Sequence, residues 1–179
     1  MTRRATAVER GPPTDLYRED FHAWAVEQAE ALRLAEDSRG DPKALQEAIG
    51  GLDLENLAEE VAGLAKSEQR ELRNRLTTVM EHLLKLQHSP TTEPRPGWRN
   101  TVLRSRVEIL RLLEDSPSLR AELPALLEQA KLDALAVLPA EMAERREGDA
   151  LKLARVMREA LKAYTPDRVQ DRAWWPGLF

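Results

Sequence analysis

The sequence predicts an all-α protein, an antiparallel up-and-down helical bundle around one long central helix, with an appended C-terminal helix and tail. Three observations lead to this prediction. Apolar residues recur with the period of a helix over one long stretch, from Asp53 to His88. Leu and Ala are abundant, whereas aromatic residues make up only 4% of the chain. No segment of useful length alternates between apolar and polar residues as a half-buried strand would.

Length and composition narrow the class of protein. A chain of 179 residues is long enough for one domain with a substantial core. The absence of cysteine rules out disulfides, thiolate catalysis and zinc–thiolate sites. The net charge of −4 is mild and indicates neither nucleic acid nor an anionic membrane. No apolar run approaches the ~20 residues of a membrane span, and the first residues lack the apolar stretch of a secretory signal. We therefore expect a cytoplasmic protein.

Shifts in composition divide the chain into three predicted parts. Residues 1–13 are polar and end in Gly-Pro-Pro, which predicts a flexible N-terminal tail. Residues 14–138 carry the helical periodicity of the bundle domain. Residues 139–179 form the C-terminal helix and a Trp-rich tail. We expect this tail to dock on the bundle, because Trp174 and Trp175 would be costly to expose.

The long central helix has a start signal, a stop signal and one apolar stripe. Asp53 suits the N-cap position, and Ser89-Pro90 ends the helix because a residue before proline disfavours the helical conformation. At about 1.5 Å per residue, such a helix extends roughly 50 Å. A helix of this length depends on tertiary packing, so we expect partner helices to bury the stripe. The stripe consists of Leu54, Leu57, Val61, Leu64, Leu72, Leu76, Val79, Leu83 and Leu86.

Two shorter helices are predicted before the long one. The first begins at Asp15 or Asp20 and ends near Ala35. The second follows Asp41-Pro42, which is an N-cap with proline at the first helical position. Gly50-Gly51 closes this second helix.

Three further helices are predicted after the long one. In order, they run from Trp98 to about Asp115, from Leu119 to Pro139, and from about Asp149 to Tyr164. Pro124 is expected to restart or kink the second of them. The segment from Pro139 to Gly148 is charged and poor in apolar residues, and Thr165-Pro166 caps a short final turn.

A row of polar side chains accompanies the apolar stripe. Polar groups at a packing seam need partners, because burying one unpaired costs roughly 1–3 kcal/mol. One interpretation is a structural ladder, such as Glu71 with Arg75 one turn later, and the other is a functional cleft. Arg106 is expected to pair with Glu68 or Glu71, or to reach water. The candidate buried polar cluster consists of Glu68, Glu71, Arg75, His82, Trp98 and Arg106.

The order of polar and aromatic residues resembles a bacterial family. The matching stretches are DLYREDFHAWAVEQAEAL, LDLENLAEEVAGLAKSEQRELRNRLTTVMEHLLKLQHSP, a Trp-Arg pair and LLEDSPSLR. They cover about Leu16 to Leu138 and are similar to domain-of-unknown-function family 29, which is common in cyanobacteria and proteobacteria. The resemblance implies a helical bundle and supplies no reaction. The matching positions are Asp20, Trp24, Glu55, Asn56, Glu59, Glu60, Ser67, Glu68, His82, Leu83, Leu84, Lys85, Pro90, Trp98, Ser116 and Pro117.

Metal binding is the first chemistry that the residues suggest. Glu19 and His22 have the i,i+3 spacing of carboxylate-bridged di-iron bundles, which need two such motifs and two further glutamates. The chain has one such motif, so the signal is weak. His22, His82 and Glu60 could converge if the first helix and the long helix pair. Otherwise His22 is exposed, and the His82 imidazole is hydrogen-bonded where the helices pack. We predict no metal and no other cofactor.

No residue is predicted to be catalytic. Along one helix, Ser67 lies more than ~20 Å from His82, so the two cannot form a dyad. No P-loop, nucleophile motif or glycine-rich phosphate loop is present. An arginine-rich stretch includes Trp98, but its arginines point several ways around the helix, so we expect a salt-bridged surface rather than nucleic-acid binding. These arginines are Arg95, Arg99, Arg104, Arg106 and Arg111.

The sequence favours a non-catalytic, cytoplasmic protein-interaction or regulatory module, although an enzyme stays an open alternative. The partner would be another protein or a second copy. No nucleic acid or membrane is expected, and any ligand is unknown. Met80 and Leu84 lie on the outer side of the long helix, where they either cover another element or form a dimer patch. The alternative is a metal-dependent enzyme with His22, His82 and glutamates between helices.

Overall fold

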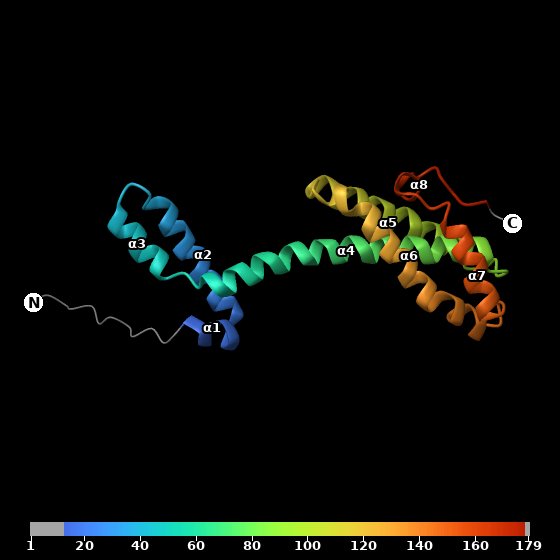
Figure 1. The fold of residues 1–179 in the computed structure, drawn as a ribbon, viewed down its shortest axis with the longest axis horizontal. Coiled ribbons are helices and arrows are strands. Elements are labelled where there is room, and N and C mark those ends of the chain that lie inside the picture. The colour runs from blue at the N-terminus through green and yellow to red at the C-terminus, as the bar shows by residue number, and fades with distance from the viewer. Residues whose placement is uncertain (1–12, 178–179) are drawn as a thin grey trace, which may run out of the picture. The chain divides into compact units, whose positions relative to one another are not determined.

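The computed structural model describes residues 13–177, and these residues form eight helices and no strand (Figure 1). The predicted all-α class and the long central helix are confirmed. The helices are α1 (Pro13–Glu19), α2 (Phe21–Asp37), α3 (Pro42–Gly50), α4 (Leu54–His88), α5 (Arg95–Asp115), α6 (Leu119–Glu144), α7 (Ala150–Leu161) and α8 (Pro166–Gln170).

The chain divides into two compact units, Met1–Ala65 and Lys66–Phe179. Helix α4 begins in the first unit and ends in the second. The tail expected at residues 1–13 lies outside the described residues except for Pro13, which begins α1. The predicted division into 14–138 and 139–179 stays a prediction.

The first unit contains α1, α2, α3 and the start of α4. Of the two predicted starts of the first helix, Asp20 is the observed one, because Asp20 leaves the helical conformation with φ −147° and separates α2 from the short α1. Its Oδ1 accepts a hydrogen bond from the backbone N–H of Ala23 at 2.9 Å and so caps α2. Asp41 caps α3, with Pro42 at the first helical position, as predicted.

The second unit has an apolar core to which α4, α5, α6, α7 and α8 all contribute. The C-terminal half of the predicted α4 stripe is fully buried, and burial of each such side chain contributes about 1.5–3 kcal/mol. Its residues are Leu72, Leu76, Val79, Leu83 and Leu86. Met80 and Leu84 are fully buried in the same unit, so they cannot form the exposed dimer patch considered above.

Most of the N-terminal half of the same stripe is exposed, although Leu57 is partly buried. The exposed fractions are 61% for Leu54, 65% for Val61 and 68% for Leu64. The prediction that the whole stripe is buried is therefore wrong for this half. A helical period shows which side of a helix is apolar, whereas burial requires another element to lie over that side.

The connection between α4 and α5 is held by an arginine. Helix α4 ends at His88 as predicted, but α5 begins at Arg95 rather than at Trp98. The Arg95 guanidinium donates to the carbonyl oxygens of Leu86 at 3.0 Å and Ser89 at 2.8 Å. These bonds satisfy carbonyl groups that the end of a helix leaves without an intrahelical donor.

Helix α6 continues through both of its prolines. It passes Pro124 and Pro139 and ends at Glu144, so the predicted end at Pro139 is wrong. A proline inside a helix removes a hydrogen bond and costs about 3 kcal/mol. Here Pro139 is buried, as are Leu138 and Met142 on either side of it, and this burial offsets the cost.

The end of α6 is set by one residue in the left-handed conformation. Arg146 has φ 61°, and this turn allows the N–H of Glu147 to reach the carbonyl oxygen of Met142 at 2.9 Å. Asp149 then caps α7, accepting a hydrogen bond from the N–H of Lys152 at 2.9 Å. The start of α7 agrees with the prediction.

The C-terminal segment returns to the core of the second unit. Thr165 caps α8, and the half-buried Trp174 and Trp175 pack against the core. The rings of Tyr164 and Trp174 meet edge to face with centroids 5.2 Å apart. The Tyr164 hydroxyl donates to Oε1 of Gln87 at 3.0 Å, and burial raises the pKa of this tyrosine. The tail therefore shares the core of the second unit.

Candidate functional site

A polar network joins α2 to the start of α4 within the first unit. The indole of Trp24, which is 2% exposed, donates from Nε1 to Oδ2 of Asp53 at 3.3 Å. Asn56 donates to the same oxygen at 2.6 Å, and the backbone N–H of Asp53 donates to Oε1 of Gln28 at 2.8 Å. The hydrogen bond from the Asn56 side chain, helped by that from Trp24, holds the pKa of Asp53 below its usual range. Asp53 thus caps α4, as predicted, and also fixes α2 to it.

Aromatic rings extend this network toward α1. The Tyr17 ring lies edge to face against Trp24 with centroids 4.8 Å apart, and Phe21 lies 5.5 Å from the same indole. The Tyr17 hydroxyl donates to the carboxylate of Glu60, which raises the pKa of the tyrosine. The polar groups of this network form hydrogen bonds with one another, so we interpret the network as structural.

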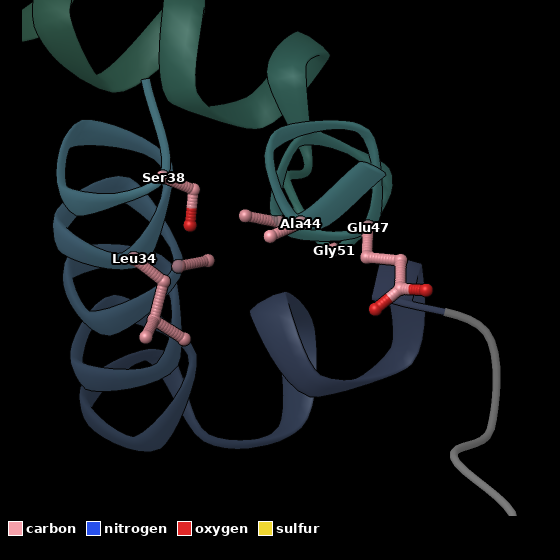
Figure 2. Close-up of a pocket in the computed structure, with 7 residues that line it drawn as sticks. Leu34, Ser38, Ala44, Glu47 and Gly51 are labelled. Atoms are coloured by element: carbon pink, nitrogen blue, oxygen red, sulfur yellow. The ribbon is translucent and has the colours of Figure 1, made fainter. Parts of the chain in front are cut away.

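A groove of about 310 Å³ lies between α2 and α3. Figure 2 shows Leu34 of α2, and Ser38 directly after that helix, opposite Ala44 of α3. Leu34 is 53% exposed and forms one edge of the groove. The residues that line it are Ala31, Leu34, Ser38, Ala44, Glu47, Ala48 and Gly51. This α2–α3 groove has small apolar walls and one carboxylate, so it can accept an apolar side chain but offers no pair of groups for acid–base chemistry.

Sequence reasoning missed the α2–α3 groove. The available signal was the run of small residues, with Ala44 and Ala48 one turn apart on α3. Small side chains leave space between two helices, but the period of a sequence does not tell which helices face each other.

The first unit combines negative charge with exposed apolar side chains. Residues 13–65 carry 13 Asp or Glu and four Lys or Arg. Large apolar side chains that stay exposed can be buried by a binding partner. The exposed large apolar side chains among the described residues of this unit are Phe21, Val26, Leu32, Leu34, Ile49, Leu54, Val61 and Leu64. Such a surface complements a partner that is both apolar and basic.

In the second unit, Arg106 is fully buried and bonds to the backbone. Its Nε donates to the carbonyl oxygen of Val169 at 2.8 Å, and its Nη2 donates to that of Trp174 at 2.9 Å. Burial lowers the pKa of Arg106. Its hydrogen-bond partners are therefore carbonyl groups of the C-terminal segment rather than the expected carboxylates of Glu68 and Glu71, and the buried side chain does not extend to the surface.

The other candidate residues have separate partners. Glu68 is exposed and accepts a hydrogen bond from Oγ of Ser116 at 2.8 Å. Arg75 pairs with Glu71 at 2.8 Å, one turn away on α4, with both side chains about half exposed. Trp98 is half-buried on α5. Of the six candidates, the structure thus joins Glu71 and Arg75 to each other.

His82 lies near an ion pair between Lys85 of α4 and Glu141 of α6. Burial, and then the charge of Lys85, lowers the pKa of His82, while Glu141 acts in the opposite direction. Nζ of Lys85 lies 3.4 Å from Oε2 of Glu141. Burial also raises the pKa of Glu81. Sequence reasoning did not single out Glu81 and Glu141, although Glu81 and Lys85 have the spacing of a helical ion pair.

Several arginines of the stretch around Trp98 are used within the second unit. The Arg99 guanidinium lies 5.6 Å from the centre of the Trp175 ring. Arg111 pairs with Glu108 at 3.3 Å, and Arg95 bonds to backbone carbonyls as described above. These arginines therefore point to different partners rather than to one surface.

Within residues 13–177, no group of three or more His, Asp or Glu side chains is arranged to hold a metal ion. Glu19 and His22, which supplied the weak metal motif, are both exposed. The alternative of a metal-dependent enzyme therefore gains no support. In the same part of the chain, no helix is both long and apolar enough to cross a membrane.

Comparison with known protein families gives a match over most of the chain. The family described as "Domain of unknown function DUF29" matches residues 16–149, well over half of the chain. No curated protein and no solved structure shows significant similarity to this chain. The family match agrees with the resemblance noted in the sequence.

Proposed function

The chain belongs to the DUF29 family, whose description states no activity, and we propose from its surfaces that it is a bacterial, cytoplasmic protein-interaction module without a catalytic role. The first unit carries the binding surface. The single observation behind the proposal is that this unit leaves large apolar side chains exposed on an acidic background.

The exposed half of the α4 stripe supports this proposal. Leu54, Val61 and Leu64 continue the stripe that is fully buried further along the helix, at Leu72 and Leu76. Covering each exposed side chain would contribute up to about 1.5–3 kcal/mol, and a micromolar complex needs about 8 kcal/mol in all. A partner that covers several of these residues would gain much of that free energy.

The polar groups of the first unit also favour binding over catalysis. Asp53 is engaged by Trp24 and Asn56, and Glu60 by Tyr17. A catalytic acid or base must be within reach of a substrate proton, whereas these carboxylates already serve the fold. The acidic background further disfavours nucleic acid, whose phosphates it would repel.

Site-specific photo-crosslinking in the native host tests the proposal. A benzoyl-phenylalanine at Leu64 samples the exposed stripe, and the same group at Leu151, which is 83% exposed in the second unit, is the matched control. We expect a crosslinked adduct of one defined mass at position 64 and none at position 151. No adduct at position 64, or the same adducts at both positions, would refute the proposal.

A further inference from the structure

Helix α3 is only partly covered by its neighbour α2. It has nine residues, none of them fully buried, and Ile49 is 40% exposed. Isolated helices shorter than about 12–15 residues are marginal in water, and most helices gain their stability from packing. The cap at Asp41 and the proline at position 42 favour the start of α3, and Ala44, Leu45 and Ala48 are half-buried where this helix packs on α2. A partner that covered the residues left exposed would bury more of this short helix.

The α2–α3 groove provides a place for that packing. Its volume of about 310 Å³ is formed largely by alanine and glycine, and Leu34 stands exposed at its edge. Water in such a groove finds few polar partners, because Ser38 and Glu47 supply the only polar side chains of the lining. A large apolar side chain that entered between Leu34 and Ala44 would displace this water and cover Leu34 (Figure 2).

The charge around the groove indicates the chemistry of the occupant. Residues 27–47 carry six Asp or Glu and three Lys or Arg. Arg39 pairs with Glu36 at 3.9 Å, which removes one charge of each sign and leaves the acidic excess unchanged. Glu47 lines the groove itself. Opposite charge across an interface favours association and rejects partners of the same sign, so the favoured occupant is cationic.

Building on the proposed function, we infer that the α2–α3 groove binds a cationic amphipathic helix of another protein. One large apolar side chain of that helix enters between Leu34 and Ala44, and a Lys or Arg of the helix pairs with Glu47. Helix α3 becomes more ordered on binding, because the partner buries more of its half-buried apolar side.

Two synthetic peptides test this inference on the full chain. One is an amphipathic helix made of Leu and Lys, and the other carries Glu at each Lys position. Fluorescence anisotropy should show that the Leu/Lys peptide binds at least about tenfold more tightly than the Leu/Glu peptide. Raising the salt from about 0.05 M to about 0.3 M should weaken binding of the Leu/Lys peptide severalfold, because salt screens surface charges. Equal affinity for the two peptides would overturn the inference.

Variants then locate the binding site. Ala48→Trp fills the groove and should weaken binding of the Leu/Lys peptide about tenfold or more, whereas Ala136→Trp, at an exposed alanine of α6, should leave it unchanged. Glu47→Lys removes the charge without filling the groove and should weaken binding severalfold, with Glu144→Lys as its control. Circular dichroism establishes that each variant is folded. Full binding by a folded Ala48→Trp variant would overturn the inference.

Two further measurements separate this inference from the proposed function. Amide shifts caused by the Leu/Lys peptide should cluster on α2 and α3, and shifts confined to the second unit would contradict the groove. If the crosslinked adduct at Leu64 forms in the host but the Leu/Lys peptide does not bind, the groove inference is wrong. The proposed function as a protein-interaction module is then still supported. Sedimentation of the free chain tests whether a second copy of the chain occupies the groove instead. A dimer that Ala48→Trp abolishes would show that it does, and would overturn the inference.

Discussion

Arg106 and Val169 lie 63 residues apart in the sequence, and Nε of the arginine donates to the carbonyl oxygen of the valine at 2.8 Å. A second bond, from Nη2 to Trp174, ties the same guanidinium to the tail at 2.9 Å. Because Arg106 is fully buried, these carbonyl groups lose their donor if the arginine is removed, and water cannot readily replace it. One side chain thus joins α5 to both α8 and the tail.

The first prediction concerns this arginine. Arg106→Ala should lower the free energy of unfolding of the second unit by about 3 kcal/mol or more, because hydrogen bonds to a charged donor contribute about 1.5–3 kcal/mol each. It should also release the tail, so that the emission of Trp174 and Trp175 shifts to longer wavelength. Urea titration followed by tryptophan fluorescence measures both effects.

Arg104→Ala is the matched control, since Arg104 is exposed on the same helix. It should change the free energy of unfolding by less than about 0.5 kcal/mol. If Arg106→Ala behaves like this control, the guanidinium does not hold the C-terminal segment.

The second prediction compares the two halves of the α4 stripe. Leu72→Ala removes a fully buried side chain and should cost about 2–5 kcal/mol of stability through lost transfer free energy and a residual cavity. Leu64→Ala removes a side chain that is 68% exposed and should cost less than about 0.5 kcal/mol. Chemical denaturation of the two variants at low protein concentration measures the difference. Equal losses would mean that residue 64 is buried in the isolated chain.

The third prediction is a stabilising substitution at the end of α6. Arg146 has φ 61°, a conformation that costs a residue with a Cβ roughly 1 kcal/mol and costs glycine almost nothing. Arg146→Gly should therefore raise the free energy of unfolding by about 0.5–1 kcal/mol, measured as a higher urea midpoint. Arg145→Gly changes the preceding residue, which has φ −79° and pairs with Glu141 at 2.7 Å, and should lower stability instead.

The fourth prediction concerns acid pH. Burial lowers the pKa of both His82 and His88. In the unfolded chain these histidines take up protons near the ordinary value of about 6.5. As the pH falls below that value, the unfolded state binds protons that the folded state rejects, so the free energy of unfolding decreases until the folded pKa values are passed. Above about pH 6.5 both histidines are neutral in the folded and the unfolded chain, so the loss of stability disappears.

Urea titrations between about pH 7.5 and pH 5 should therefore show a loss of stability that becomes smaller in the His82→Gln/His88→Gln double variant. The raised pKa of Glu81 acts in the opposite sense, because its contribution is present at low pH and is lost as the pH rises through the folded value. His22→Gln changes an exposed histidine and controls for removal of an imidazole as such. An unchanged pH slope in the double variant would contradict the prediction.

The candidate sites show where sequence reasoning reached its limit. Glu71 and Arg75 were predicted to pair because they lie one turn apart on one helix, and they do. Arg106 was expected to pair with a carboxylate or to reach water, but its hydrogen-bond partners are carbonyl groups 62 to 68 residues away. Local spacing predicts local pairs, whereas a partner from another helix depends on packing that the sequence does not display.

By itself, the sequence determined the all-α class, the family resemblance, the caps at Asp41 and Asp53, and which side of α4 is apolar. These features rest on interactions within a few residues, so a single stretch of chain carries the information. Only the tertiary structure decided that Leu72 is buried while Leu64 is exposed, that α6 runs through Pro139, and that α2 and α3 enclose a groove. Burial and cavities arise between elements distant in sequence, and their free energies depend on which surfaces meet.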